Sequence, residues 1–284
     1  MYRPYFVRPL LAVVACLSAA GAVRAAPPPA YDFSPVNQYN LQVSAGFWNP
    51  IIRYVSQKCG VRLNLKLGRT SADTTSYVLT REVDFAFTNH LFSPDRARMG
   101  WTVFGRRDAP PVRAQIVVPA DSNVMTLAQL AGESVAFPGP EAMIAYKVAY
   151  AQLQRRNIPV DVVFAGNMDA AFAQMFAGKA MAAGANSQLV RNYQGREHKS
   201  FRVLWSSEPF IDLALMASPR VPADQVRAVA QAFIGMDKDP EGRRILAAAT
   251  ELVHAEAPIA FVAASDADYA GYRAFYADAP PTVR

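Results

Sequence analysis

The chain has 284 residues, of which 52% are hydrophobic and 18% are charged, and its formal net charge is +6. This length is sufficient for one large or two medium domains. The basic balance is mild and Lys and Arg form no cluster, which argues against a nucleic-acid partner.

Residues 1–25 have the pattern of a secretory signal peptide. Arg3 and Arg8 precede an apolar run from Leu10 to Ala22, and a short small-residue segment ends at Ala25 as in a cleavage site. The run is too short for a membrane span, and no second stretch approaches about 18 apolar residues. We therefore predict a soluble periplasmic protein that is cleaved near Ala25.

Cys16 offers an alternative, because Val13 to Cys16 loosely matches a lipoprotein box. The apolar run continues past Cys16 with no polar tether, so we favour cleavage near Ala25 over a lipid anchor. Cleavage removes three arginines and no acid, which lowers the net charge from +6 to +3. It also leaves Cys59 as the only cysteine, which we interpret as a small buried residue at a helix end.

The first part of the mature chain alternates between strand and helix patterns. Alternating or continuous apolar runs predict strands at 31–36, 61–67 and 83–88, and apolar residues at helical spacing predict helices at 42–58 and 70–81. This order is typical of a parallel α/β sheet flanked by helices.

A second series of elements follows a polar, Pro-containing stretch at 106–111. Strands are expected at 114–118, 134–137, 160–164 and 179–185, and helices at 126–132, from Pro140 onward and at 169–177. Apolar runs at 203–205 and 213–217 then lead to helices at 223–236 and 241–249, before an aromatic and Pro-rich tail at 269–284. Two such series predict two lobes with a ligand cleft between them.

The segment Ser134 to Tyr150 reads as a strand, a tight turn and a helix start. Pro140 suits the first helical position, where a missing backbone N–H has no cost. The first turn of a helix is a common anion site, because its N–H groups are unpaired and its dipole is positive there. This turn carries Glu141, Ala142 and Met143, with no hydroxyl and no basic side chain.

Several stretches between residues 31 and 250 occur in an order that resembles one family. They are FWNPIIRYVSQKCGVRLNL, TREVDFAF, QIVVPADSNVMTLAQLAGESVAF, FAGNMDAAFAQMFAGKAMAA and VLWSSEPFIDLALM, followed by PADQVRAVAQAF and MDKDPEGRRIL. They resemble the periplasmic binding proteins of phosphonate, phosphite and phosphate ABC transporters, which are two-lobed type II receptors. The resemblance implies a first lobe of residues 31–116 and 206–284 and a second lobe of residues 117–205.

The resemblance also implies positions for the ligand site. The family binds phosphoryl oxygens with a Ser-Thr-Ser-Gly run at a helix start, and Glu141-Ala142-Met143-Ile144 stands there in this sequence. Other family contacts fall at Ser71, at Met168 with Asn167 beside it, and, for an acidic pair that binds a ligand amine, at Gln188 and Asp212. Only Asp212 keeps the residue type of the family, and Glu141 is expected to repel a second anion, so we predict that phosphonate binds poorly.

Four side chains that follow predicted strands are expected to face the cleft. They are Asn89, His90, Asn167 and Asn186. These residues are also common in turns and at strand ends without any ligand. Met143, Met168 and His90 are soft or neutral ligands of the Cu(I) type, but we favour packing roles for the two methionines, and no metal or cofactor is predicted.

The sequence contains no motif of an enzyme. Its three histidines lie outside any nucleophile, metal or acid–base pattern, and there is no glycine-rich phosphate loop. We predict a monomeric periplasmic solute-binding protein that captures a small ligand between two lobes and delivers it to the membrane permease of an ABC transporter. The alternative is a receptor of the same fold that feeds a sensor kinase or another periplasmic partner.

Overall fold

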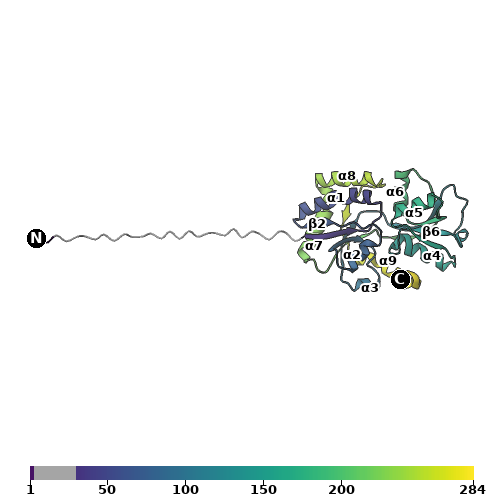
Figure 1. Cartoon of the computed structure of the whole chain (residues 1–284), viewed down its shortest axis with the longest axis horizontal. Helices are drawn as coiled ribbons and strands as arrows, with labels where there is room; N and C mark the ends of the chain where they lie inside the picture. The colour runs from purple at the N-terminus through teal and green to yellow at the C-terminus, as the bar shows by residue number, and fades with distance from the viewer. Residues whose placement is uncertain (3–29) are drawn as a thin grey trace.

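The computed structural model describes residues 1–2 and 30–284. The predicted signal peptide and the alternative lipid anchor at Cys16 lie outside the described residues. Two mixed sheets, each flanked by helices, form two lobes that lie side by side (Figure 1). We call the six-stranded sheet with its helices the first lobe, and the five-stranded sheet with its helices the second lobe.

The sheet of the first lobe has the strand order β11-β4-β10-β3-β1-β2. Its strands are β1 (Ala30–Pro35), β2 (Arg62–Leu65), β3 (Phe85–Thr88), β4 (Thr102–Arg107), β10 (Ala214–Ala217) and β11 (Phe261–Val262). Strands β1 to β4 run in one direction, whereas β10 is antiparallel to both of its neighbours and β11 is antiparallel to β4. The reversal arises because β10 enters the first lobe from the second one.

Helices cover both faces of this sheet. They are α1 (Leu41–Cys59), α2 (Asp73–Leu79), α3 (Pro94–Ala97), α7 (Ala223–Ile234) and α8 (Pro240–Leu252), with 3₁₀ turns at Met236–Lys238 and Asp266–Tyr269. The side chains of β3 alternate between the two faces of the sheet. Phe85 and Phe87 belong to the apolar cluster that includes residues of α1 and α7, and Ala86 belongs to the cluster that includes a residue of α2.

Helix α1 has clear signals at both of its ends. The side chain of Asn40 accepts a hydrogen bond from the Val43 N–H, and Gly60 ends the helix in the left-handed conformation. Cys59, at the C-terminal end, is half-buried rather than fully buried, and partial burial raises the pKa of its thiol. The thiol therefore stays protonated at neutral pH, in agreement with a structural role.

The sheet of the second lobe has the strand order β7-β6-β8-β5-β9. Its strands are β5 (Val112–Pro119), β6 (Ser134–Phe137), β7 (Asp161–Phe164), β8 (Ala182–Asn186) and β9 (Phe201–Phe210). The helices are α4 (Ala149–Arg155), α5 (Met168–Phe176) and α6 (Ser187–Glu197), with a 3₁₀ turn at Leu127–Leu130 and a π-helical turn at Met143–Val148. Only β5 runs against the other strands, because it brings the chain in from the first lobe.

Strands β5 and β9 carry the chain between the lobes. The lobe boundaries predicted at 116/117 and 205/206 lie inside these two strands. The strands pair with each other in the five-stranded sheet over almost their whole length. The division of the chain into lobes at those residues stays a prediction.

The C-terminal segment contacts both lobes. Helix α9 (Ala270–Asp278) and the 3₁₀ turn Pro281–Val283 follow the first-lobe elements in the chain. Tyr269 stacks on Phe92 of the first lobe, whereas Asp278 forms an ion pair with Arg155 at 2.7 Å in α4 of the second lobe. The C-terminal segment therefore bridges the two lobes, and Figure 1 shows α9 at the lower side of the molecule between them.

Most predicted elements are observed within a few residues of their expected bounds. Strand β6 is confirmed at Ser134–Phe137, but the helix that follows it does not begin at Pro140. The Ala142 N–H bonds to the Gly139 carbonyl at 3.2 Å, so Pro140 is the second residue of a β-turn, a position that Pro also favours. Strand β4 and helix α6 had no counterpart in the prediction.

Candidate functional site

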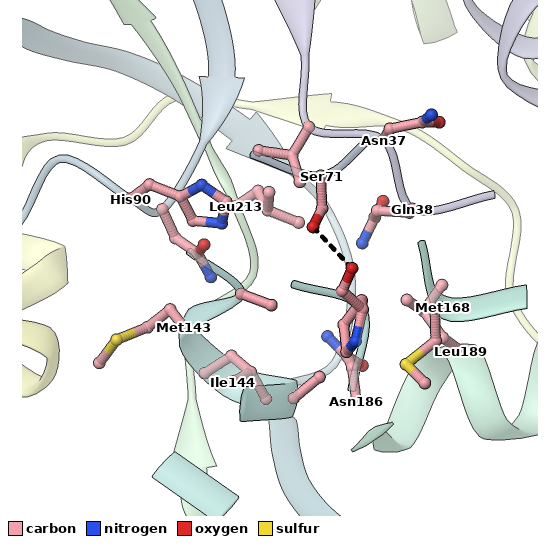
Figure 2. A pocket seen from close by; sticks show the side chains of 15 residues that line it. Asn37, Gln38, Ser71, His90, Met143, Ile144, Met168, Asn186, Leu189 and Leu213 are labelled. Atoms are coloured by element: carbon pink, nitrogen blue, oxygen red, sulfur yellow. Dashed lines mark hydrogen bonds between the residues drawn. The ribbon is translucent and has the colours of Figure 1, made fainter. Parts of the chain in front are cut away.

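A small cavity of about 50 Å³ lies between the lobes (Figure 2). The first lobe lines it through the residues that follow β1 and β3, the residue Ser71 just before α2 and the residue Leu213 just before β10. The second lobe lines it through the segment after β6 and the starts of α5 and α6. Its lining residues are Val36, Asn37, Gln38, Ser71, Asn89, His90, Pro138, Ala142, Met143, Ile144, Ala145, Met168, Asn186, Leu189 and Leu213. None of these side chains is an acid, a lysine or an arginine.

Seven of the eleven predicted site residues line this cavity, and four do not. Those that line it are Ser71, Asn89, His90, Ala142, Met143, Met168 and Asn186. Those that do not are Glu141, Asn167, Gln188 and Asp212. Each of these four is held by another group of the protein.

The helix start after β6 forms one wall of the cavity. The N–H groups of Met143, Ile144 and Ala145 have no acceptor within the described residues, as is usual for a first helical turn. The Ser71 hydroxyl donates to the Pro138 carbonyl at 3.2 Å from the opposite lobe, as Figure 2 shows. The helix start therefore presents backbone N–H groups without protein acceptors, and the side chains of residues 142–145 are apolar.

Glu141 lies beside the cavity rather than in it. Arg96 of α3 donates to both carboxylate oxygens of Glu141, at 2.5 and 3.0 Å, and to the His90 carbonyl at 2.9 Å. Burial alone would raise the pKa of Glu141, but the hydrogen bonds and charge of Arg96 lower it, so the carboxylate stays ionised. We expected Glu141 to repel a second anion at the helix start; in the structure its charge is paired with that of Arg96.

His90 is buried in the wall of the cavity and is neutral. Its Nδ1 lies 2.7 Å from the Thr75 hydroxyl, which fixes the ring. Burial lowers the pKa of His90 to about 3; the charges of Arg96 and Lys147 also lower it, and that of Glu141 raises it. The other ring nitrogen is left for a contact with the cavity.

Arg107 of β4 connects Asp212 and Gln188 behind the cavity. Its Nε donates to the Asp212 carboxylate at 2.7 Å, and its Nη2 donates to the Gln188 side-chain oxygen at 2.9 Å. The Arg107 and Asp212 side chains are only 3% and 0% exposed. The acidic position for a ligand amine is thus already occupied by a cation of the protein, and removal of either partner would leave a buried unpaired charge.

The three predicted asparagines differ in what they contact. Asn89 donates to the Tyr272 hydroxyl at 3.2 Å, which links the cavity wall to α9. Asn186 accepts from the Gln188 N–H at 2.9 Å and caps α6, yet it also lines the cavity. Asn167 caps α5 by accepting from the Ala170 N–H at 2.9 Å and does not reach the cavity.

Met143, Met168 and His90, the candidate ligands for Cu(I), do not converge on one point. Figure 2 places Met143 with His90 on one side of the cavity and Met168 on the other. Within residues 1–2 and 30–284, no group of three His, Cys, Asp or Glu side chains is arranged to hold a metal ion. The arrangement therefore gives no support to the Cu(I) alternative.

Sequence reasoning missed part of the cavity wall and its two supporting arginines. Val36, Asn37 and Gln38 follow β1, and the rule that ligands bind beyond the carboxyl ends of parallel strands would have included them. Asn37 is held by a donor bond to the Gly68 carbonyl at 3.2 Å and by an acceptor bond from Ser44 at 2.7 Å. Arg96 and Arg107 had no signal in the sequence, because their partners are distant in the chain.

The chain matches known proteins at the level of family and fold. None of the helices in the described part of the chain is both long and apolar enough to span a membrane. A search of curated proteins gives no significant match. The model of the family described as "ABC transporter, phosphonate, periplasmic substrate-binding protein" matches residues 33–269.

Three solved structures illustrate the shared fold. A binding protein component of an ABC phosphonate transporter from Pseudomonas aeruginosa has a TM-score of 0.73 at 16% identity, over 87% of this chain and 85% of that one. PhnD1 from Prochlorococcus marinus, in complex with methylphosphonate, has a TM-score of 0.72 at 15% identity, over 85% and 95%. The alkanesulfonate-binding protein SsuA from Xanthomonas axonopodis pv. citri, bound to MOPS, has a TM-score of 0.61 at 17% identity, over 91% and 97%.

These identities show the fold alone, whereas the family match covers most of the chain. The chain therefore belongs to the phosphonate-binding family of periplasmic substrate-binding proteins, which are components of ABC transporters and not enzymes.

Proposed function

We propose that this protein captures a small uncharged polar ligand in the interlobe cavity and delivers it to an ABC permease. One observation carries the proposal: among residues 30–284, no acidic side chain, lysine or arginine lines the cavity. The membership in a family of transporter components supports delivery to a permease over the signalling alternative. We propose that the protein acts as a periplasmic monomer after cleavage near Ala25.

The cavity offers both donors and acceptors to such a ligand. Gln38 has a side chain with no hydrogen bond within the described residues, and it extends toward the cavity in Figure 2. Asn186 has a free amide N–H₂, since only its oxygen is used as a cap. Asn89 has a free oxygen, since its nitrogen donates to Tyr272. The apolar side chains of Met168, Leu189 and Leu213 would contact a small hydrocarbon part.

A phosphonate or phosphate anion is a poor fit to this lining. Burial of an unpaired charge costs several kcal/mol unless a counter-charge or several strong donors replace water. The free N–H groups of residues 143–145 are such donors, but Ser71 is the one hydroxyl of the lining and already donates to Pro138. Because Arg96 neutralises Glu141, the weak anion binding that we propose arises from missing cations and hydroxyls and not from repulsion by Glu141.

The proposed ligand contacts are the predicted residues that line the cavity together with Gln38. They are Gln38, Ser71, Asn89, His90, Ala142, Met143, Met168 and Asn186. Glu141, Asn167, Gln188 and Asp212 would support the wall from behind and touch no ligand.

The test is a thermal-shift screen of the purified mature protein, because a ligand that binds only the folded state raises its Tm. The probes are methylphosphonate, inorganic phosphate and a panel of small uncharged amides and polyols. We expect a saturable rise in Tm with a member of the uncharged panel, reduced in the Gln38→Ala variant, and no shift with either anion. Tight binding of methylphosphonate by calorimetry would overturn the proposal.

A further inference from the structure

An ion pair joins the two lobes at the edge of the cavity. Arg96 lies in α3 of the first lobe, and Glu141 lies in the turn before the first helix of the second lobe. The two N–H groups of the guanidinium meet both carboxylate oxygens, which is the geometry that arginine and carboxylate favour. Separation of the two lobes would therefore have to break this pair.

Arg96 is held in place before it meets Glu141. One of its N–H groups also donates to the carbonyl of His90, a residue of the cavity wall in its own lobe. The guanidinium therefore points at the second lobe without a large loss of side-chain entropy on closure. Its side chain is 19% exposed and that of Glu141 is 22% exposed, so solvent screens the pair only in part.

A second set of contacts joins the lobes close to this pair. The Ser71 N–H donates to the Gly166 carbonyl at 2.7 Å, and the Ser71 hydroxyl donates to the Pro138 carbonyl at 3.2 Å. Gly139 permits this approach, because a Cβ at that position would lie 2.5 Å from the Ser71 hydroxyl oxygen. All these groups belong to the protein and need no ligand to bond.

We propose that the Arg96–Glu141 pair is an interlobe clasp that keeps the lobes closed without a ligand. Arg96 and Glu141 are positioning residues, since neither lines the cavity. The clasp goes beyond the proposed function, because it concerns the closed conformation itself whatever the cavity takes. Ligand binding to a mainly closed protein requires little further closure, and exchange then depends on transient release of the clasp.

The test measures the distance between the lobes directly. Spin labels at Ala173→Cys in α5 and Ala247→Cys in α8, in a Cys59→Ser background, report the separation by electron–electron double resonance. Both alanines are exposed helix residues, one in each lobe. The protein is unfolded and refolded first, to remove any small molecule carried through purification.

We expect a single short distance in the parent protein. In Arg96→Gln and in Glu141→Gln the ratio of closed to open molecules should fall about tenfold, as expected for lost hydrogen bonds between charged groups. The matched control is Arg98→Gln. This substitution breaks the ion pair between Arg98 and Asp95, which lies within the first lobe, and the Arg98 and Asp95 side chains are 76% and 90% exposed. The control should keep the short distance.

Two further variants separate the clasp from a general loss of stability. The exchanged pair Arg96→Glu with Glu141→Arg should return most of the closed population. The exchanged pair carries the test if a single clasp variant does not fold, because it keeps both charges paired. Gly139→Ala should force the Ser71 hydroxyl away from Pro138 and shows how much that second contact adds to closure. Distance distributions of Arg96→Gln and Glu141→Gln that match that of Arg98→Gln would overturn the proposal, as would a mainly open parent protein.

Discussion

His90 is a neutral imidazole that burial keeps from accepting a proton. Its folded-state pKa is about 3, against about 6.5 in an unfolded chain. Between these values the unfolded state binds more protons than the folded state, so acidification favours unfolding. We expect His90 to lower the free energy of unfolding by about 1.4 kcal/mol for each pH unit below about pH 6.

The measurement is urea unfolding at pH 7, 6 and 5, before most carboxylates titrate. His90→Gln keeps a polar side chain opposite Thr75 but does not titrate, so its stability should change less over this range. His198→Gln is the matched control, because His198 is exposed at the end of α6. If the free energy of unfolding fell equally with pH in the His90→Gln variant and in the parent protein, His90 would not be the cause of the pH dependence.

The location of a site residue could be predicted where the residue lies directly beyond a predicted strand or at the start of a predicted helix. Ser71, Asn89 and Asn186 follow predicted strands or begin predicted helices, and all three reach the cavity. Asp212, which was also predicted as a contact, is paired with Arg107 and does not line the cavity. A sequence gives no signal for a partner that is 105 positions away, because only the folded chain brings the two charges together.

At the scale of elements, the segment from β6 into α4 shows where local signals succeed and fail. The short run Ser134–Phe137, three of whose residues are apolar and buried, predicts β6 correctly, since such runs fit a strand buried on both faces. The turn that follows was assigned to the helix, because Pro140 fits a first helical position and a β-turn equally well. The π-helical turn cannot be read from residue types, since both Tyr146 and Lys147 donate to the Ala142 carbonyl only after packing.

Strand β4 was missed although its sequence alternates. Val103, Gly105 and Arg107 lie on the buried side of Thr102–Arg107, and the two arginines at the end of the strand conceal that pattern. A buried arginine is compatible with a strand only because Asp212 and Gln188 pair with it. Helix α6 was missed because its polar residues and Gly195 weaken its periodicity.

Gly184 gives a test of the close packing between β8 and the helix start. A Cβ at this position would overlap with the Phe137 ring and with the Ala145 carbonyl oxygen. Backbone cannot move aside as a long side chain can, so we expect Gly184→Ala to destabilise the fold by about 1–3 kcal/mol in urea unfolding.

The matched control is Gly271→Ala in α9. A Cβ there meets no atom within 4 Å, and the residue is exposed and helical. This substitution should stabilise the protein by about 0.5–1 kcal/mol, since Ala is the better helix former. Equal stabilities for the Gly184→Ala variant and the parent protein would show that the helix start is looser than the structure describes.

At the scale of the whole molecule, the lobes share their apolar cores. One cluster contains Phe33 and Phe87 of the first lobe with Phe172 of the second, and another contains Val103 with Phe137. The two-lobed architecture was predictable from the order of elements, but this shared packing and the bridging tail were not. Both depend on side chains that meet only when β5 and β9 connect the lobes.

The shared cores predict one cooperative thermal transition for the described part of the chain. Separation of the lobes would expose apolar side chains on both sides, so neither lobe is expected to unfold alone. Differential scanning calorimetry of the mature protein should give one peak whose calorimetric and van't Hoff enthalpies agree. The clasp variant Glu141→Gln should lower the Tm without splitting that peak, because the clasp governs closure while the connecting strands and shared clusters hold the lobes in one cooperative unit. Two resolved transitions in the parent protein would show that the lobes unfold independently and would contradict the shared core.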